Sequence, residues 1–219
     1  MNSIDTSTNN NQECFFVDIQ RKLEVEELRK QEYAKASGFH LDLSTLQWKV
    51  SDDESYVMVA QKNLQIVSTM RGEVIDQISL LEKKLECPWN FPVNLDGAVL
   101  LLSRAATDSS QRLTGMNLVL RYWFLQLAMH YHIPYVVGTF VTGSPRENSL
   151  REMGYQFFTN PFGWQQSTYR SLREVKVVVL DMKNNGEQAL QYCQSRASEA
   201  IKQYPFKTSF PDIKYVRSL

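Results

Sequence analysis

The chain has 219 residues, of which 43% are hydrophobic and 22% charged, a balance typical of one globular domain with a sizeable core. Lysine plus arginine and aspartate plus glutamate each number 24, so no overall charge draws the protein to nucleic acid or to a membrane surface. The three cysteines include no C-x-x-C pair, which argues against a disulfide framework or a zinc knot, and no apolar run approaches the roughly 18 residues of a membrane span.

The first residues, MNSIDTSTNNNQ, lack the basic start and the apolar stretch of a signal peptide. Together with the sparse cysteines, this predicts a cytoplasmic protein without integral membrane contact. Residues 1–12 are rich in Asn, Ser and Thr and are expected to form a disordered tail, and residues 13–219 are expected to form a single domain.

The first half of the chain predicts one strand, one helix and a hairpin. Residues 15–19 predict the strand, and the residues up to Lys35 predict a surface helix with charged pairs about one turn apart. Residues 37–55 predict a connector with a few apolar anchors. Residues 56–61 (YVMVAQ) and 64–71 (LQIVSTMR) predict two strands around a tight turn.

After the hairpin, strands and helices alternate. Ile75, Ile78, Leu81 and Leu85 have helical spacing and predict a helix before Pro88. The later predicted elements are a strand over 98–103, a polar loop, a helix over about 116–131, a strand over 135–141, a short helix over 144–154, a short strand over 155–158, a strand over 173–182 and an amphipathic helix over 185–204. This order predicts a mixed α/β (α+β) sheet with helices on its faces.

The polar loop Gln111-Arg112-Leu113-Thr114-Gly115-Met116 lies between a buried strand and a buried helix. It is either a plain turn that contains one glycine or a cradle for a phosphate. Gly115 lets the backbone approach a ligand closely, and the next helix directs its free N–H groups and positive dipole end at the same place. Arg112 can add a charge-assisted contact. The order of the flanking elements favours the cradle.

Three stretches resemble a known superfamily: LEVEELRKQEYAKASGF, SDDESYVMVAQKNLQIVSTMRG and LLLSRAATD. They are similar to the opening helix, the acidic lead-in with its hairpin and Arg, and the Ser-Arg strand of the GNAT acyltransferases. The resemblance runs from about Phe15 to Met182 and is nearest to the autoinducer synthases and long-chain N-acyl amino acid synthases. It implies a central, mostly antiparallel sheet flanked by helices.

The resemblance also implies a donor, an acceptor and their binding residues. The donor would be a coenzyme A thioester or the phosphopantetheine arm of an acyl carrier protein, with no metal. Backbone groups of Val99, Leu101 and Ser103 would pair with the thioester arm, and residues 111–116 would hold the phosphates. Arg71 and Arg104 would orient the donor or a carboxylate on a small amine acceptor.

Acyl transfer to an amine needs a proton acceptor, donors for the oxyanion and a route for the thiolate to leave. The glutamate of the autoinducer synthases falls at Leu101 here, and the tyrosine of many other members falls at Leu150, so both usual proton handlers are missing. Glu73 is a candidate base acting through water, although a glutamate there can simply be a solvated strand end. Ser103 and Arg104 complete the catalytic candidates, because an Arg on an apolar strand needs an acid or a ligand as partner.

Other candidates bind substrate or partner, and each has a plain structural alternative. Of the acidic run at residues 52–54, Asp53 is the candidate for binding the amine, although such a run commonly faces solvent. Tyr122 and Trp123 either line a tunnel for a fatty chain or belong to the core. Four arginines are either a basic face for coenzyme A or an acyl carrier protein, or scattered surface residues: Arg112, Arg121, Arg146 and Arg151.

The sequence therefore predicts an N-acyltransferase that moves an acyl group, including a long-chain one, from a coenzyme A or carrier-protein thioester to a small amine or amino acid. Two alternatives stay open. An acyl-homoserine lactone synthase is disfavoured by Leu101, and a catalytically silent module that binds an acyl ligand or a protein is favoured by the missing proton handlers.

Overall fold

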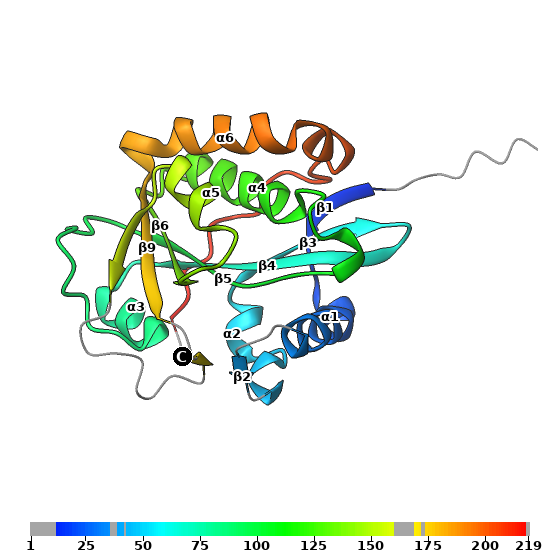
Figure 1. The fold of residues 1–219 in the computed structure, drawn as a ribbon, viewed down its shortest axis with the longest axis horizontal. Coiled ribbons are helices and arrows are strands. Elements are labelled where there is room, and N and C mark those ends of the chain that lie inside the picture. Colours follow the sequence, from blue (N-terminus) through cyan, green and yellow to red (C-terminus); the bar gives the residue numbers. More distant parts are fainter. Residues whose placement is uncertain (1–11, 36–38, 42, 160–168, 172–173, 218–219) are drawn as a thin grey trace, which may run out of the picture.

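The computed structural model describes residues 12–35, 39–41, 43–159, 169–171 and 174–217 (Figure 1). Most of the predicted tail lies outside these residues. Gln12 already belongs to the first strand, so the predicted tail is one residue too long. Among the described residues, no helix combines the length and the apolar character that a bilayer crossing requires.

The described strands form one seven-stranded sheet and one small two-stranded sheet. In spatial order, the large sheet consists of β1 (Gln12–Phe16), β3 (Tyr56–Lys62), β4 (Gln65–Ile75), β5 (Val99–Thr107), β6 (Tyr135–Val141), β9 (Val175–Asp181) and β7 (Gln156–Thr159). Neighbouring strands are antiparallel except β5 and β6, which are parallel. The small sheet pairs β2 (Phe39–Leu41) with β8 (Tyr169–Ser171).

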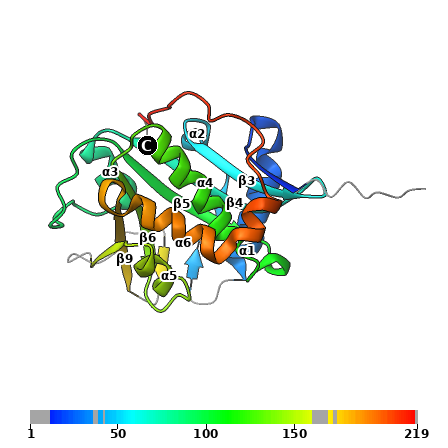
Figure 2. The ribbon, with the colours of Figure 1, turned by 90° about the horizontal axis from the view of Figure 1, so that it is seen from above.

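Helices cover both faces of the large sheet (Figure 1). The α-helices are α1 (Lys22–Ala34), α2 (Val50–Asp53), α3 (Ile78–Leu85), α4 (Met116–His130), α5 (Glu147–Glu152) and α6 (Met182–Gln203). Helices α4 and α6 pack together over one face, with α5 beside them, while α1, α2 and α3 lie against the other (Figures 1 and 2). This arrangement confirms the predicted mixed α/β sheet.

The core is divided by the sheet because successive strand residues point to opposite faces. Leu100 and Leu102 of β5 belong to the large apolar cluster under α4 and α6. Val99 and Leu101 belong to a second cluster with Leu81 of α3, on the other face. Up to Ser103, odd-numbered residues of β5 therefore point to the face that carries α1, α2 and α3.

Among the predicted boundaries that were wrong, three have a clear local cause. The first strand ends at Phe16 rather than at Ile19, because Asp18 accepts a hydrogen bond from Gln20 N and starts the short 3-10 helix Ile19–Arg21. The hairpin turns at Asn63 and Leu64, both with positive φ, one residue later than predicted. Strand β4 continues to Ile75, so Ile75 belongs to a strand rather than to the predicted helix.

Residues 205–217 connect two distant parts of the sheet (Figure 2, red). Near their start, Cys14 N donates to Pro205 O at 2.8 Å and Lys207 N to Cys14 O at 2.9 Å. Near their end, Val216 N donates to Val74 O at 2.9 Å. Strand β4 extends beyond the point where its pairing with β3 stops, at Gly72, so these last residues cover a β4 edge that β3 leaves open.

Candidate functional site

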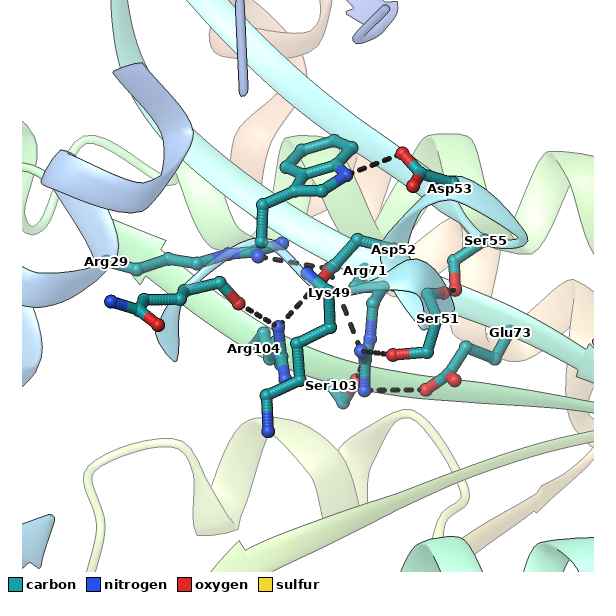
Figure 3. Close-up of polar contacts among 12 residues, drawn as sticks. Arg29, Lys49, Ser51, Asp52, Asp53, Ser55, Arg71, Glu73, Ser103 and Arg104 are labelled. Carbon is teal, nitrogen blue, oxygen red and sulfur yellow. Dashed lines mark hydrogen bonds and ion pairs between the residues drawn. The ribbon is translucent and has the colours of Figure 1, made fainter. Parts of the chain in front are cut away.

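A buried carboxylate, Asp52, lies at the centre of the candidate site. Helix α2 begins after Lys49, whose backbone N–H donates to Asp52 Oδ2 at 2.9 Å. This turn directs Asp52 inward, where it is 1% exposed. The neighbouring Asp53 points outward and accepts a hydrogen bond from Trp48 Nε1 at 2.7 Å (Figure 3).

Three arginines from three different elements surround Asp52 (Figure 3). Arg29 Nη1 of α1 lies 3.1 Å from Oδ1, Arg71 Nη1 of β4 3.6 Å from Oδ1, and Arg104 Nη1 of β5 2.7 Å from Oδ2. Burial raises the pKa of Asp52, but the three guanidinium groups and the Lys49 N–H outweigh it, so the pKa lies below its ordinary value. Asp52 is therefore ionised at neutral pH.

The most deeply buried of the three is Arg29. Burial is the main cause that lowers the pKa of Arg29 to about 10, and the nearby Asp52 opposes it, so the guanidinium stays charged at neutral pH. Its Nε and Nη2 atoms are buried without a hydrogen-bond partner among the described residues.

A second buried carboxylate, Glu73 of β4, shares Arg71 with Asp52. Arg71 Nη2 lies 2.7 Å from Glu73 Oε2, and Lys84 Nζ of α3 lies 2.9 Å from Oε1. Arg71 also donates from Nε to Ser103 Oγ at 3.0 Å. We call the following six residues the charged cluster: Arg29, Asp52, Arg71, Glu73, Lys84 and Arg104. Glu73 lies inside β4, just beyond the last β3–β4 pair, and is fully buried, so the alternative that it is a solvated strand end was wrong.

A β-bulge directs Arg104 into this cluster. Ser103 pairs with Arg71 and Ala106 with Thr69, so two residues of β5, Arg104 and Ala105, lie opposite one residue of β4. Arg104 has a φ of +50°, a conformation that costs a residue other than glycine on the order of 1–3 kcal/mol. The predicted strand ended at Ser103, whereas β5 continues through the bulge to Thr107.

Strand β5 also separates from its parallel neighbour beside the bulge. Pairing between β5 and β6 runs from Val99–Tyr135 to Leu102–Gly138 and then stops, although β5 continues to Thr107 and β6 to Val141. In the described structure, the β6-facing edge of residues 103–107 therefore has no strand beside it. An extended ligand arm could lie there and bond to the β5 backbone.

The predicted phosphate loop lies between β5 and α4. Gly115 has a φ of +85° and precedes α4, and its carbonyl accepts from the N–H groups of Leu118 and Val119. The φ of Gly115 favours glycine there, and a Cβ at this position would also lie close to Ala197 Cβ of α6, at 3.3 Å. Arg112 already has a carboxylate partner, because its Nη2 lies 2.8 Å from Glu32 Oε2 of α1.

The structure brings some predicted residues together and separates others. Arg71, Glu73, Ser103 and Arg104 meet in the charged cluster. Gln111, Leu113 and Thr114 lie in the exposed loop, while Val99, Leu101 and Met116 have buried side chains. Tyr122 and Trp123 face α6 and the segment that follows it: Tyr122 Oη accepts from Gln194 Nε2, and Trp123 Nε1 donates to Tyr204 O. Asp53 hydrogen-bonds Trp48 outside the cluster.

Sequence reasoning missed Arg29, Asp52 and Lys84 as members of the cluster. A signal for Arg29 was present, because it follows Val25 by four residues and therefore shares the buried face of α1. Asp52 stood within the acidic run that was recognised, but the prediction chose its neighbour. Nothing in the local sequence pointed Lys84 toward Glu73.

Glu73 lies directly opposite Leu101 in the β4–β5 register. Directly opposed residues of antiparallel strands have Cβ atoms about 5 Å apart on the same face. A carboxylate is therefore present on the neighbouring strand, across from the position where the resemblance implies one. Within the described ranges, no group of three or more His, Cys, Asp or Glu side chains has an arrangement that could hold a metal ion.

No protein-family model matches the sequence, and no curated protein matches it. Solved structures do resemble it. The AHL synthase LasI is 16% identical, with a TM-score of 0.59 over 83% of this chain and 95% of that chain. FeeM, an N-acyl amino acid synthase from uncultured soil microbes, is 11% identical, with a TM-score of 0.57 over 84% of this chain and 97% of that one.

An N-acetyltransferase from Staphylococcus aureus Mu50 is 9% identical, with a TM-score of 0.54 over 78% of this chain and 99% of that chain. At these identities, the likeness is one of fold. It confirms the fold that the three sequence stretches implied. The chain therefore has the fold that these acyltransferase structures share.

Proposed function

We propose that this protein is an N-acyltransferase that moves an acyl group from a coenzyme A or carrier-protein thioester to the amine of a small, carboxylate-bearing acceptor such as an amino acid. One observation carries the proposal. Strand β5 both leaves β6 after Leu102 and carries Ser103 and Arg104 of the charged cluster. An open strand edge for a donor arm thus adjoins a set of buried charges that can orient an acceptor.

The reaction is a direct attack with both substrates bound. The acceptor nitrogen attacks the thioester carbonyl carbon, the oxyanion of the tetrahedral intermediate collapses, and the C–S bond breaks. The nitrogen loses one proton and the departing thiolate takes one, so no oxidant or metal is needed. Backbone N–H groups of β5 beyond Leu102 are the proposed donors to the arm and to the oxyanion.

Arg71 and Arg104 are the proposed partners of the acceptor carboxylate. Both guanidinium groups are already oriented by Asp52, and Arg71 is additionally oriented by Glu73. Orientation before binding lowers the entropy lost when the acceptor docks. Arg29 lies deeper and holds Asp52 in place rather than contacting substrate.

Glu73 can act as proton acceptor through water or as a positioning residue. The second role fits its surroundings better, because a proton on the carboxylate would weaken its ion pairs with Arg71 and Lys84. Glu73→Gln distinguishes the two roles. A base predicts a large loss of kcat that diminishes as pH rises, whereas a positioning residue predicts a rise in KM for the acceptor with the pH profile unchanged.

The proposal is tested by thermal shift and by thiol release with the purified chain. Coenzyme A, acetyl-coenzyme A and a long-chain acyl-coenzyme A are compared first, because a ligand at about a hundred times its dissociation constant adds about 2.7 kcal/mol of stability. Thiol release is then followed with a panel of amino acids and simple amines. We expect release that requires an acceptor with both an amine and a carboxylate, and no release with any donor and acceptor would refute transfer.

A second candidate function is a catalytically silent module that binds an acyl ligand. It is favoured by the absence of a proton handler at Leu101 and Leu150, both of which are buried in the core. This candidate predicts stabilisation by a donor without thiol release under any condition tested.

The three free cysteines, all buried, fit a protein that works in the reducing cytoplasm.

A further inference from the structure

Lys84 of α3 is the most deeply buried of the lysines that form ion pairs in the described part of the chain. Its side chain is 9% exposed, whereas the side chains of the others are 22% to 70% exposed. A buried ammonium group is costly unless a carboxylate compensates it. Among the described residues, Glu73 is the carboxylate within ion-pair distance of Lys84.

The packing of α3 brings Lys84 to Glu73. Leu81 of α3 lies in the apolar cluster that also contains Leu101 of β5. Lys84 follows Leu81 by three residues and therefore lies beside it on the helix surface. Glu73 lies directly opposite Leu101 on β4, and Lys84 Nζ donates to its Oε1 at 2.9 Å. One helix thus covers the strand pair and also supplies a cation to it.

The two carboxylate oxygens of Glu73 are held in different ways. Oε1 accepts the hydrogen bond from Lys84. Oε2 lies 2.7 Å from Arg71 Nη2, but this contact lacks the geometry of a hydrogen bond, and Oε2 accepts none from the described residues (Figure 3). Attraction between charges depends on distance, whereas a hydrogen bond also fixes direction. The rotation of the Glu73 carboxylate therefore depends on Lys84.

Glu73 in turn holds one end of the Arg71 guanidinium. Ser51 Oγ lies 3.4 Å and Asp52 Oδ1 3.6 Å from Nη1, and Ser103 Oγ accepts from Nε at 3.0 Å. Glu73 holds Nη2. Rotation of the Glu73 carboxylate would therefore change the position of Nη2, in the guanidinium that the proposed function assigns to the acceptor carboxylate.

We propose that Lys84 is a positioning residue of the acceptor site: it fixes the Glu73 carboxylate, which keeps Arg71 oriented for the acceptor. This inference rests on the proposed function for the role of Arg71. Lys84 acts through Glu73, which distinguishes it from a lysine that only stabilises the end of α3. Helix α3 thereby becomes part of the acceptor site without contacting the substrate.

Lys83 provides the matched control. It is the adjacent residue, is exposed, and lies in the same last turn of α3, so both lysines interact favourably with the helix dipole. Lys84→Met and Lys83→Met each remove one ammonium group from that turn. A difference between the two variants therefore reports on the contact with Glu73.

Thiol release, measured with the full chain, gives kcat and the KM values for donor and acceptor. We expect Lys84→Met to raise the acceptor KM about tenfold or more, and to leave kcat and the donor KM within about threefold. Lys84→Arg should recover most of the acceptor affinity, and Lys83→Met should match the wild type. Lys84→Met/Glu73→Gln should have the acceptor KM of Glu73→Gln alone, because Lys84 acts through Glu73.

A second measurement requires no turnover. The Nε–H signal of Arg71, identified by its loss in Arg71→Lys, is followed by NMR of the full chain. This group donates to Ser103, so its signal reports how the guanidinium is held. We expect the signal to shift and to exchange faster with water in Lys84→Met, and to stay unchanged in Lys83→Met.

Three outcomes would overturn the positioning role: an unchanged acceptor KM in Lys84→Met, effects of Lys84→Met and Glu73→Gln on KM that add, or an unchanged Arg71 signal. If Lys84→Met does not fold, the double variant, which removes both charges, still tests whether its acceptor KM equals that of Glu73→Gln. A changed Arg71 signal in a protein that releases no thiol would refute the proposed transfer and leave the link between Lys84 and Arg71 standing.

Discussion

Asp52→Asn would remove the negative charge shared by three guanidinium groups while keeping the size of the side chain. Arg29, whose side chain is 0% exposed, would lose the carboxylate 3.1 Å from its Nη1, and two of its other nitrogen atoms already lack partners. Arg71 would keep its ion pair with Glu73. Arg104 would lose its 2.7 Å contact with Asp52. The perturbation thus acts on charge in the most deeply buried part of the site.

Removing one partner of a buried ion pair destabilises a protein by about 3–5 kcal/mol, because the remaining charge stays buried without compensation. An asparagine oxygen can still accept the hydrogen bond from Lys49 N. We therefore expect the free energy of unfolding to fall by about 3 kcal/mol, at the lower end of this range. This is a large share of the roughly 5–15 kcal/mol that stabilises a typical domain.

Urea unfolding followed by tryptophan fluorescence measures the loss, and Asp53→Asn is the matched control. Asp53 is the adjacent residue, is exposed and contacts Trp48 outside the cluster, so its replacement should cost no more than about 1 kcal/mol. A loss below about 1 kcal/mol for Asp52→Asn, or equal losses for the two variants, would contradict the ion-pair account.

The same carboxylate makes stability depend on pH. The pKa of Asp52 is lowered in the folded protein, so its contribution is fully present above the unfolded value, about 3.9, and is lost as pH falls through the folded pKa. Wild-type stability should therefore fall below about pH 4. Asp52→Asn lacks this group and should show a shallower acid decline, whereas a parallel decline would assign the acid sensitivity to other carboxylates.

Three further changes test other parts of the structure. Gly72→Ala should cost about 1–3 kcal/mol, because the new Cβ would lie 2.4 Å from Phe124 Cε1, and an unchanged melting temperature would contradict that packing. Leu101→Glu should destabilise the fold by opposing Glu73 with a like charge, and adding Glu73→Leu should recover part of the loss in a double-mutant cycle; strict additivity would mean that the two positions do not interact. Burial raises the pKa of Cys14, Cys87 and Cys193, so a thiol reagent should label the native chain slowly and the urea-unfolded chain fast; rapid native labelling would contradict their burial.

Elements with strong periodicity were predictable from the sequence. The strand over 135–141 matches β6 at both ends, and the helix over 116–131 matches α4 within one residue. Both are largely apolar segments, bounded by Gly115 at one end and separated by Pro134. Local pattern alone decides such segments.

Charged residues inside strands were the main source of error. The predicted hairpin strand ends at Arg71, yet β4 continues because Arg71 and Glu73 neutralise each other and Lys84 reaches them from α3. Likewise β5 was ended at Ser103, because a bulge with an Arg at positive φ has no local signature.

The candidate site was predictable where the residues lie on neighbouring strands. Arg71 and Ser103 were singled out separately, and the structure joins them by a hydrogen bond of 3.0 Å. Asp52 and Arg29 were not predicted as site residues, because the ion pair between them depends on how α1 and α2 dock on the sheet. That docking is a tertiary property, which no spacing within either segment encodes.

The contact between Val216 and Val74 bears on how the chain folds. Until Val216 docks, residues 73–75 of β4 present an unpaired strand edge, a template on which another molecule can add a strand. Pairings between residues so far apart in the sequence form late and slow folding down. Self-association during refolding should therefore begin at this edge, and a chain truncated before Val216 should aggregate at concentrations at which the full chain stays monomeric.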